Sequence, residues 1–313
     1  MDFSLFRTLI GNKISQSQGS SQREFKAWIA SGKYQVTNIT SDEVELYILD
    51  HDFLAESLGY DFARFTCAAV ESLRNISEDI SFPKATAWAG IRSYYSSFFA
   101  AHATLRLFGT SCSQIEPQQA SLLNRYASQI YGLNGKIPAG FYAGEFNSQK
   151  NTLKLKKLSE THKDTWTIFN KKLSELSQSI LTVPGLTKSK QEISTFLSQL
   201  STAITDQNKL SSGNWLSMYR NNLNYKQQYD AWFPYKKNSV KFKQLEKYIN
   251  SWHSSKFNPN IGLLETDERL RFFGTCAAIT HLLKGLSADL SSISPQKSIH
   301  RTTTEKLIKL TKI

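Results

Sequence analysis

The segment from Arg220 to Tyr225 carries the side chains best suited to chemistry, in the order Arg-Asn-Asn-Leu-Asn-Tyr. A guanidinium can hold two oxygens of a phosphate, and amide or phenol groups beside it can donate or accept hydrogen bonds. The segment therefore has the side chains to bind a phosphate. An unperturbed phenol titrates at about pH 10, so Tyr225 is a poor base at neutral pH.

The stretch after Tyr225 places aromatic rings next to lysines, and residues 150–157 add a second lysine-rich stretch. Proteins hold single-stranded nucleic acid by stacking bases on aromatic rings in a basic setting. The same rings could instead form a hydrophobic plug under a long loop. The candidate RNA-binding residues are Lys226, Tyr229, Trp232, Lys236, Lys237, Lys154, Lys156 and Lys157.

The positive charge of the chain is concentrated in its second part. The 313 residues have a formal net charge of +12, with 38 Lys and Arg against 26 Asp and Glu. Residues 1–135 hold 11 basic and 13 acidic side chains, whereas residues 136–313 hold 27 and 13, a balance of +14. Such asymmetry favours RNA as a partner of residues 136–313, although a lysine coat that aids solubility is the alternative.

Most other chemistries have no pattern in this sequence. The six histidines and three cysteines lack metal-ligand spacing, and no Gly-rich phosphate loop, His-Glu-x-x-His or Gly-x-Ser-x-Gly motif occurs. We therefore expect no metal and no cofactor. No apolar run approaches the roughly 18 residues that span a bilayer, and the start lacks the features of a signal peptide. These patterns predict a cytoplasmic protein with no membrane association.

Helical periodicity dominates the expected secondary structure. A short helix over 22–31 should end at Gly32, and a β-hairpin should follow at 34–40 and 44–49. After residue 51, apolar residues recur at the three- and four-residue spacing of a buried helix face, which predicts mostly helices. The aromatic helix that precedes Gly109 should bury Trp88, Tyr95, Phe98 and Leu105. The other expected helices cover 164–181, 189–207, 239–253 and 264–290, with a short one after Trp215.

Two segments resemble the HEPN domain superfamily (higher eukaryotes and prokaryotes nucleotide-binding). Residues 90–109, with Tyr94-Tyr95 and Phe98-Phe99-Ala-Ala, resemble the second core helix of that family, and residues 220–225 resemble its Arg-x-x-x-Asn/Asp-Tyr motif. The resemblance implies a mainly α fold, a HEPN-like bundle that often forms two-fold dimers. On this basis the chain divides into a 1–50 extension with the β-hairpin, a 51–290 helical body with a long helical insertion at about 110–212, and a peripheral basic tail at 291–313.

The resemblance also implies a function. Active HEPN proteins are metal-independent ribonucleases of toxin–antitoxin, phage-defence and RNA-processing systems, with an Arg, four to six residues and then a His. Here Tyr225 stands where that His is expected, so the resemblance implies Arg220, Asn224 and Tyr225 as the candidate catalytic residues. The resemblance thus implies an antiviral-defence or toxin protein that engages RNA, either as an endoribonuclease with a degenerate motif or without cleavage. The alternatives are an adaptor subunit whose enzyme is another chain, and a DNA-binding accessory protein.

Helix geometry sets a condition on this site. Five residues of α-helix turn through about 500°, which leaves Arg220 and Tyr225 roughly 140° apart. A shared site therefore needs a distorted helix start or a second chain. We expect a second copy of the chain to complete the site, with Arg220 exposed in a basic groove and Asn224 as its hydrogen-bonding partner.

Overall fold

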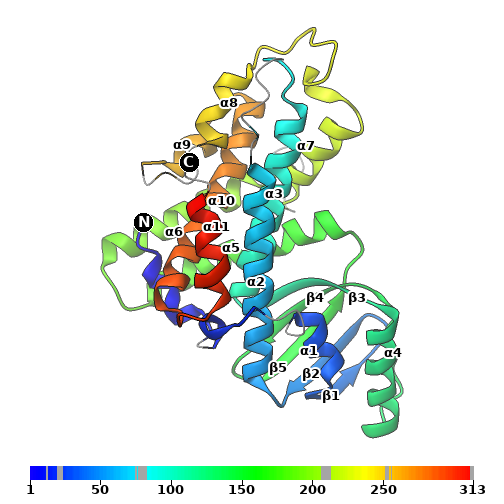
Figure 1. Cartoon of the computed structure of the whole chain (residues 1–313). Helices are drawn as coiled ribbons and strands as arrows, with labels where there is room; N and C mark the ends of the chain where they lie inside the picture. The colour runs from blue at the N-terminus through cyan, green and yellow to red at the C-terminus, as the bar shows by residue number, and fades with distance from the viewer. Residues whose placement is uncertain are drawn as a thin grey trace.

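An antiparallel β-sheet lies at one end of an elongated helical body (Figure 1). The computed structural model describes residues 1–11, 13–19, 24–74, 76, 83–205, 213–250, 254 and 256–310. The longer helices are α1 (Phe25–Ser31), α2 (His51–Leu73), α3 (Ala87–Leu107), α4 (Pro117–Arg125), α5 (Thr161–Thr182), α6 (Thr187–Ala203), α7 (Trp215–Asn224), α8 (Phe242–Ile249), α9 (Pro259–Leu263), α10 (Glu268–Ile293) and α11 (Glu305–Leu310). Short helical turns are η1 (Phe3–Leu9), η2 (Ile14–Gln16), η5 (Tyr126–Ile130), η6 (Gln228–Asp230) and η7 (His300–Thr304).

The sheet overturns the predicted mainly α fold. Its five strands run in the order β1-β2-β5-β4-β3, and every neighbouring pair is antiparallel. The strands are β1 (Tyr34–Ile39), β2 (Glu43–Ile48), β3 (Thr110–Ile115), β4 (Gly140–Asn147) and β5 (Thr152–Lys157). Three of them lie inside the 110–212 segment that was predicted to be a helical insertion. The fold is therefore a mixed α/β structure, and the prediction of a helical bundle with only a hairpin was wrong.

The first elements agree with the sequence pattern. Helix α1 ends where Gly32 adopts a φ of +67°, a left-handed conformation that favours glycine. The predicted hairpin is confirmed, because β1 and β2 pair from Tyr34 opposite Ile48 to Ile39 opposite Val44. The hairpin does not stand alone, since β5 pairs with the other edge of β2. This pairing joins the predicted N-terminal extension to the predicted insertion in one sheet.

One face of the sheet forms its own hydrophobic core. Val44 and Leu46 of β2 and Leu153 and Leu155 of β5 point into this core, while the residues between them point outward. Helix α1, the start of α2 and α4 cover this face, with side chains such as Trp28 fully buried. The outward face carries charged side chains, which bear on the candidate RNA-binding lysines below.

Helix α3 runs through the centre of the larger, helical core. It packs against α2, α5, α7 and α10, and most of its side chains are buried. Phe98 and Leu105 are buried as predicted, and Tyr95 is half-buried. Trp88 is 64% exposed, so the prediction that it is buried was wrong. It lies in the first turn of α3, where its ring meets the edge of Trp232 with ring centroids 5.8 Å apart.

Several predicted boundaries shift. Helices α5, α6, α8 and α10 correspond to expected helices, although the ends predicted at 206–207 and 251–253 lie outside the described residues. The C-terminal segment is not peripheral. His300 is 1% exposed, its Nε2 atom donates a hydrogen bond to the Ile14 carbonyl, and its ring packs against Phe62 of α2.

Acid should destabilise the protein through His300. Burial lowers the pKa of this imidazole to about 4, against about 6.5 in an unfolded chain. Between these two pH values the unfolded state binds a proton that the folded state does not, so the free energy of unfolding falls as pH falls. The full loss from this one group is about 3 kcal/mol.

Urea unfolding near neutral pH and near pH 4.5 checks this expectation. The His300→Gln variant keeps a hydrogen-bond donor but cannot titrate, so it should lose less stability than the unmodified protein between the two conditions. An identical loss in both proteins would contradict the assignment.

Candidate functional site: buried Arg220 and its partner His162

Helix α7 directs Arg220 toward α3 and α5. Trp215, Leu216 and Leu223 of α7 are buried, which fixes the rotation of this short helix against its neighbours. Arg220 consequently points inward and is only 6% exposed. The predicted exposure of Arg220 in an open basic groove was therefore wrong.

The guanidinium of Arg220 donates hydrogen bonds to three side chains. Its Nη1 atom lies 2.8 Å from Asn221 Oδ1, and its Nη2 atom lies 3.1 Å from Tyr95 Oη and 2.9 Å from His162 Nε2. Its Nε atom is buried without a partner. Among the described residues, Arg220 makes no ion pair with a carboxylate. Within that part of the chain, Arg220 is a buried cation with neutral hydrogen-bonding partners.

Aromatic rings enclose the same guanidinium. Its central carbon lies 5.3 Å from the ring centroid of Tyr94, 5.6 Å from that of Tyr95 and 5.7 Å from that of Tyr225. These distances allow cation–π attraction, which partly offsets the lost hydration of the charge. We refer to Arg220, His162, Tyr94, Tyr95 and Tyr225 together as the Arg220 cluster.

The hydrogen bonds define the state of His162. Arginine can only donate, so His162 Nε2 must accept from it and the ring proton must reside on Nδ1. That Nδ1 lies 2.9 Å from Tyr94 Oη, which also accepts a hydrogen bond from Trp166 Nε1 at 3.0 Å. Burial, and then the charge of Arg220, lower the pKa of His162 to about 4. His162 is therefore a neutral imidazole at pH 7.

The cluster has the chemistry of an anion site. Charged side chains are seldom buried without a charged partner. Loss of their hydration costs several kcal/mol, and hydrogen bonds to neutral groups offset only part of this cost. A phosphate oxygen in contact with Arg220 would supply the missing negative charge. The same anion would raise the pKa of His162, since a nearby negative charge favours the imidazolium.

The end of α7 brings Tyr225 to this site within one chain. The helix ends at Asn224, and Tyr225 is its C-cap residue, 72% exposed with its ring over the guanidinium. A second copy of the chain is thus not needed to bring Arg220 and Tyr225 together. The expected partner Asn224 is half-buried, and Asn221 is the amide that accepts from Arg220.

The candidate base-stacking residues are partly engaged within the protein. Tyr229 stacks on Tyr219, with ring centroids 4.1 Å apart. Trp232 donates from Nε1 to the Leu223 carbonyl at 2.8 Å, and its ring meets Trp88. Both rings therefore have a structural role as well as partial exposure.

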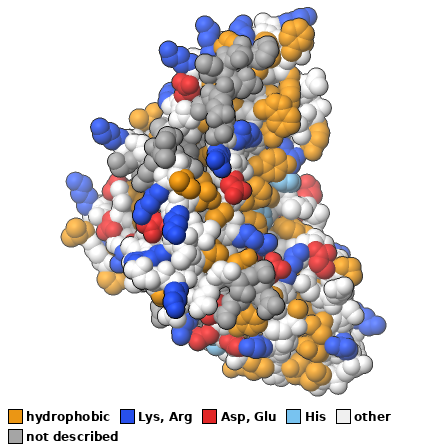
Figure 2. Space-filling view, viewed as in Figure 1, with side chains coloured by type: hydrophobic (Ala, Val, Ile, Leu, Met, Phe, Trp, Pro, Cys, Tyr) orange, Lys and Arg blue, Asp and Glu red, His pale blue; other side chains and the backbone are white. Residues whose placement is uncertain are grey.

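A hydrophobic surface nevertheless remains open around them. Phe233 is 82% exposed and Trp88 is 64% exposed. Figure 2 shows hydrophobic side chains gathered over α7 and the loop after it, with Lys and Arg side chains at the margin. We call this the aromatic surface, and its residues are Trp88, Tyr225, Trp232, Phe233 and Tyr235.

The two groups of candidate lysines differ in their surroundings. Lys226, Lys236 and Lys237 are exposed beside the aromatic surface, and within the described chain none of them pairs with a carboxylate. On the sheet, the Lys154 Nζ atom lies 2.7 Å from a Glu43 oxygen.

Acidic residues surround the lysines of β5. Glu45 and Glu145 lie opposite Lys154 on the two neighbouring strands, and Glu43 lies opposite Lys156. The hydrogen bond that Lys154 donates to Glu43 raises the pKa of Lys154. Strand β5, with Lys157 at its end, lies at the opposite end of the molecule from the loop after α7 (Figure 1). The fold therefore does not bring the two lysine groups together.

Sequence reasoning missed His162 as a site residue. It lies at the start of α5, 58 positions from Arg220, and only the packing of α5 against α3 and α7 brings the two side chains together. No spacing rule could have found it. Tyr94 and Tyr95 were recognised only as core aromatics, because the sequence does not show that a cation lies against them.

A scan against protein-family models, a search of curated proteins and a search of solved structures found no match to this chain. The described residues contain no group of three or more His, Cys, Asp or Glu side chains placed to hold a metal ion. Within the same residues, no helix is both long and apolar enough to span a bilayer.

Proposed function

We propose that this protein engages single-stranded RNA, with a phosphodiester held at Arg220 and bases stacked on the aromatic surface. The observation that carries the proposal is the buried guanidinium without a carboxylate partner among the described residues, next to a neutral imidazole. A phosphate supplies the charge that this site lacks, and exposed rings beside lysines suit unpaired bases. The wider role in a defence or toxin system stays a prediction from the HEPN resemblance.

The aromatic surface and the Arg220 cluster share one side of α3. Trp88 and Tyr95 are seven residues apart, which is close to two helical turns, so they lie along the same face. Trp88 contacts Trp232 at one end of this line, and Tyr95 contacts Arg220 at the other. A strand of RNA laid along α3 thus reaches stacking rings and the phosphate site together.

The same arrangement supports cleavage without a metal. In this step, the Nη2 atom of Arg220 exchanges its hydrogen bond to His162 for one to a phosphate oxygen, and the freed His162 Nε2 takes the proton of a ribose 2′-hydroxyl as its oxygen bonds to phosphorus. The bond from phosphorus to the 5′-oxygen breaks, and the imidazolium returns the proton to that oxygen. Arg220 stabilises the negative charge on the phosphorus-bound oxygens. The 2′-hydroxyl restricts this reaction to RNA.

The His162→Gln variant separates binding from cleavage. Glutamine can still accept the hydrogen bond from Arg220, so RNA affinity should stay within about twofold, whereas loss of a proton acceptor should slow cleavage by about 10²-fold or more. The assay uses labelled single-stranded RNA and DNA of one sequence in EDTA, and His51→Gln, an exposed position, is the control.

The outcomes of this assay distinguish the nuclease step from RNA binding alone. RNA cleaved by the unmodified protein and by His51→Gln, but not by His162→Gln, supports the nuclease step. Binding without cleavage by any of them removes that step and leaves the RNA-binding proposal. Absence of RNA binding overturns the proposal.

The lysines beside the aromatic surface should dominate the salt dependence of RNA binding. Each phosphate contact on a single strand contributes about 0.7 to the slope of log affinity against log salt. Replacing Lys226, Lys236 and Lys237 by Glu should therefore reduce this slope by about 2. The matched triple change at Lys154, Lys156 and Lys157 should change it little, because acidic side chains already balance β5. Fluorescence anisotropy across a salt series measures both, and an equal effect of the β5 triple would contradict the placement.

The adaptor function is the second candidate, and the aromatic surface favours it too. Exposed aromatic side chains gathered in one patch are typical of protein interfaces as well as of RNA platforms. A variant with Trp88→Ser and Phe233→Ser removes two of the most exposed rings. If the protein is an adaptor, the unmodified protein should bind RNA weakly or not at all. The variant should then lose binding to a protein partner with no change in RNA affinity.

A further inference from the structure

The two adjacent tyrosines of α3 use their hydroxyl groups differently. Tyr94 is fully buried, and its Oη atom accepts hydrogen bonds from Trp166 Nε1 at 3.0 Å and from His162 Nδ1 at 2.9 Å. The Tyr95 Oη atom lies 3.1 Å from Arg220 Nη2. Because arginine can only donate, Tyr95 Oη accepts this hydrogen bond and its own O–H proton is directed elsewhere.

The O–H group of Tyr95 is available as a donor. A phenol can donate one hydrogen bond while it accepts another, so the contact with Arg220 does not use the proton of Tyr95. In the part of the chain that the structure describes, no carbonyl, carboxylate or other side chain accepts that proton. Since Tyr95 is only half-buried, a bound ligand can accept it.

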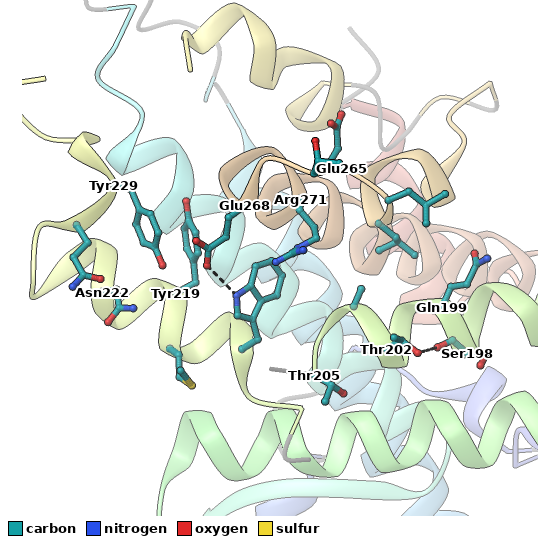
Figure 3. Close-up of a pocket in the computed structure, with 17 residues that line it drawn as sticks. Ser198, Gln199, Thr202, Thr205, Tyr219, Asn222, Tyr229, Glu265, Glu268 and Arg271 are labelled. Atoms are coloured by element: carbon teal, nitrogen blue, oxygen red, sulfur yellow. Dashed lines mark hydrogen bonds between the residues drawn. The ribbon is translucent and has the colours of Figure 1, made fainter. Parts of the chain in front are cut away.

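The cavity on the other side of α7 is separate from this site (Figure 3). It has a volume of about 900 Å³ and lies between α6, α7 and the start of α10, with Tyr219 and Asn222 of α7 in its wall. Arg220 is not among the described residues that line it, and its guanidinium points instead toward α3 and α5. An anion that binds Arg220 therefore does not enter through this cavity.

The open side of the Arg220 cluster is the side of Tyr95. Tyr94 is fully buried and closes the cluster toward the core. In contrast, Tyr95 and His162 are half-buried, and Tyr225, whose ring lies over the guanidinium, is 72% exposed. A ligand consequently reaches Arg220 past these three side chains.

An anion on this side meets two groups that bond to the same nitrogen. The Nη2 atom of Arg220 donates to both Tyr95 Oη and His162 Nε2. A phosphate oxygen that takes a hydrogen bond from Nη2 therefore lies beside the Tyr95 hydroxyl, which can donate a second one. Hydrogen bonds to a charged acceptor are roughly twice as strong as those between neutral groups. His162 Nε2 carries no proton, so of these two neighbours only Tyr95 can add a donor.

We propose that Tyr95 is a phosphate-binding residue, whose hydroxyl donates to a non-bridging oxygen of the phosphodiester at Arg220. The inference rests on the proposed RNA function and adds stereochemical selectivity to it. The two non-bridging oxygens of a phosphodiester are stereochemically distinct, and a single hydroxyl on one side of Nη2 contacts one of them. The site should therefore distinguish the two oxygens.

Stereopure phosphorothioate strands test this contact, because sulfur is a weaker hydrogen-bond acceptor than oxygen. The probes are one single-stranded 2′-fluoro RNA sequence with phosphate, Rp-phosphorothioate or Sp-phosphorothioate linkages, and the missing 2′-hydroxyl prevents cleavage. Fluorescence anisotropy measures their affinity for the full chain. The unmodified protein should bind one phosphorothioate strand about tenfold more weakly than the other, since one of them places sulfur at Tyr95.

Tyr95→Phe removes the hydroxyl and keeps the ring that packs against Tyr94 and Phe99. It should bind the phosphate strand about tenfold more weakly and lose the preference between the two phosphorothioate strands. The matched control is Tyr131→Phe. Tyr131 is also half-buried, and its hydroxyl donates to the Tyr34 carbonyl at 3.3 Å, so this variant should keep both the affinity and the preference.

Three results would overturn the inference while the RNA proposal stands. The first is the absence of any preference between the phosphorothioate strands in the unmodified protein, and the second is unchanged binding of the phosphate strand by Tyr95→Phe. The third is weaker binding by Tyr95→Phe with the preference intact, which would show that Tyr95 only holds Arg220 in position. If the unmodified protein binds no RNA, the RNA proposal fails and this inference fails with it, so the two failures are distinguishable.

Discussion

Arg220→Met should abolish RNA cleavage and weaken RNA binding without lowering the stability of the protein. Removing a preorganised charge from a phosphoryl-transfer site typically costs about 10²–10³ in rate. The stability effect runs the other way, because Met fills a similar volume and removes an uncompensated buried charge. We therefore expect an unfolding free energy equal to or above that of the unmodified protein. Urea unfolding and the RNA assay measure the two effects.

Arg106→Met is the matched comparison for this prediction. Arg106 is also buried, at 1% exposure, but its Nε atom lies 3.3 Å from the carboxylate of Asp61. Removing Arg106 leaves a buried carboxylate with less compensation, so this variant should be destabilised. If Arg220→Met is destabilised as strongly as Arg106→Met, or if it retains full RNA binding and cleavage, Arg220 is a structural residue and not a phosphate site.

Local patterns in the sequence predicted the helices well and the sheet poorly. Helices α2 and α5 repeat apolar residues at helical spacing, and that signal does not depend on distant contacts. Strand β3 has the sequence Thr-Ser-Cys-Ser-Gln-Ile, with small residues and no alternation of large apolar and polar side chains. Its strand conformation depends on pairing with β4, which the sequence pattern does not reveal.

One strand was predictable and was missed. Strand β5 alternates Leu153 and Leu155 with lysines, which is the period of a half-buried strand. This period places Lys154 and Lys156 on the outward face of a sheet, where cross-strand partners decide their charge environment.

The candidate site was predictable only in part. Arg220 and Tyr225 are neighbours in sequence, and the structure brings the ring of Tyr225 over the guanidinium. The burial of Arg220 depends on the rotation of α7, which its buried side chains set against α3 and α5. His162 depends on tertiary structure alone. Sequence spacing therefore identified the cation, while packing determined its partners and its protonation environment.

Asp61→Asn should produce the largest loss of stability among these variants, about 3–5 kcal/mol. Asp61 is 2% exposed and accepts hydrogen bonds from Arg106 at 3.3 Å and from Arg64 at 2.9 Å. Asparagine has the same shape but no charge, so the buried guanidinium of Arg106 would lose its compensating carboxylate. The remaining partners of Arg106 are neutral, the Cys112 carbonyl and the Ser113 hydroxyl on β3.

This pair links helices α2 and α3 to the sheet, because Asp61 belongs to α2 and Arg106 to α3, and Arg106 also donates hydrogen bonds to Cys112 and Ser113 of β3. A double-mutant cycle separates the pair from its parts. If the charge left behind causes the loss, Asp61→Asn combined with Arg106→Met should be more stable than Asp61→Asn alone, since no buried charge then remains at that point. Strictly additive losses, measured by urea unfolding, would show that the ion pair is not the cause. RNA affinity measured where each variant is folded should be unchanged, because Asp61 acts on the stability of α3 and makes no contact with the Arg220 cluster.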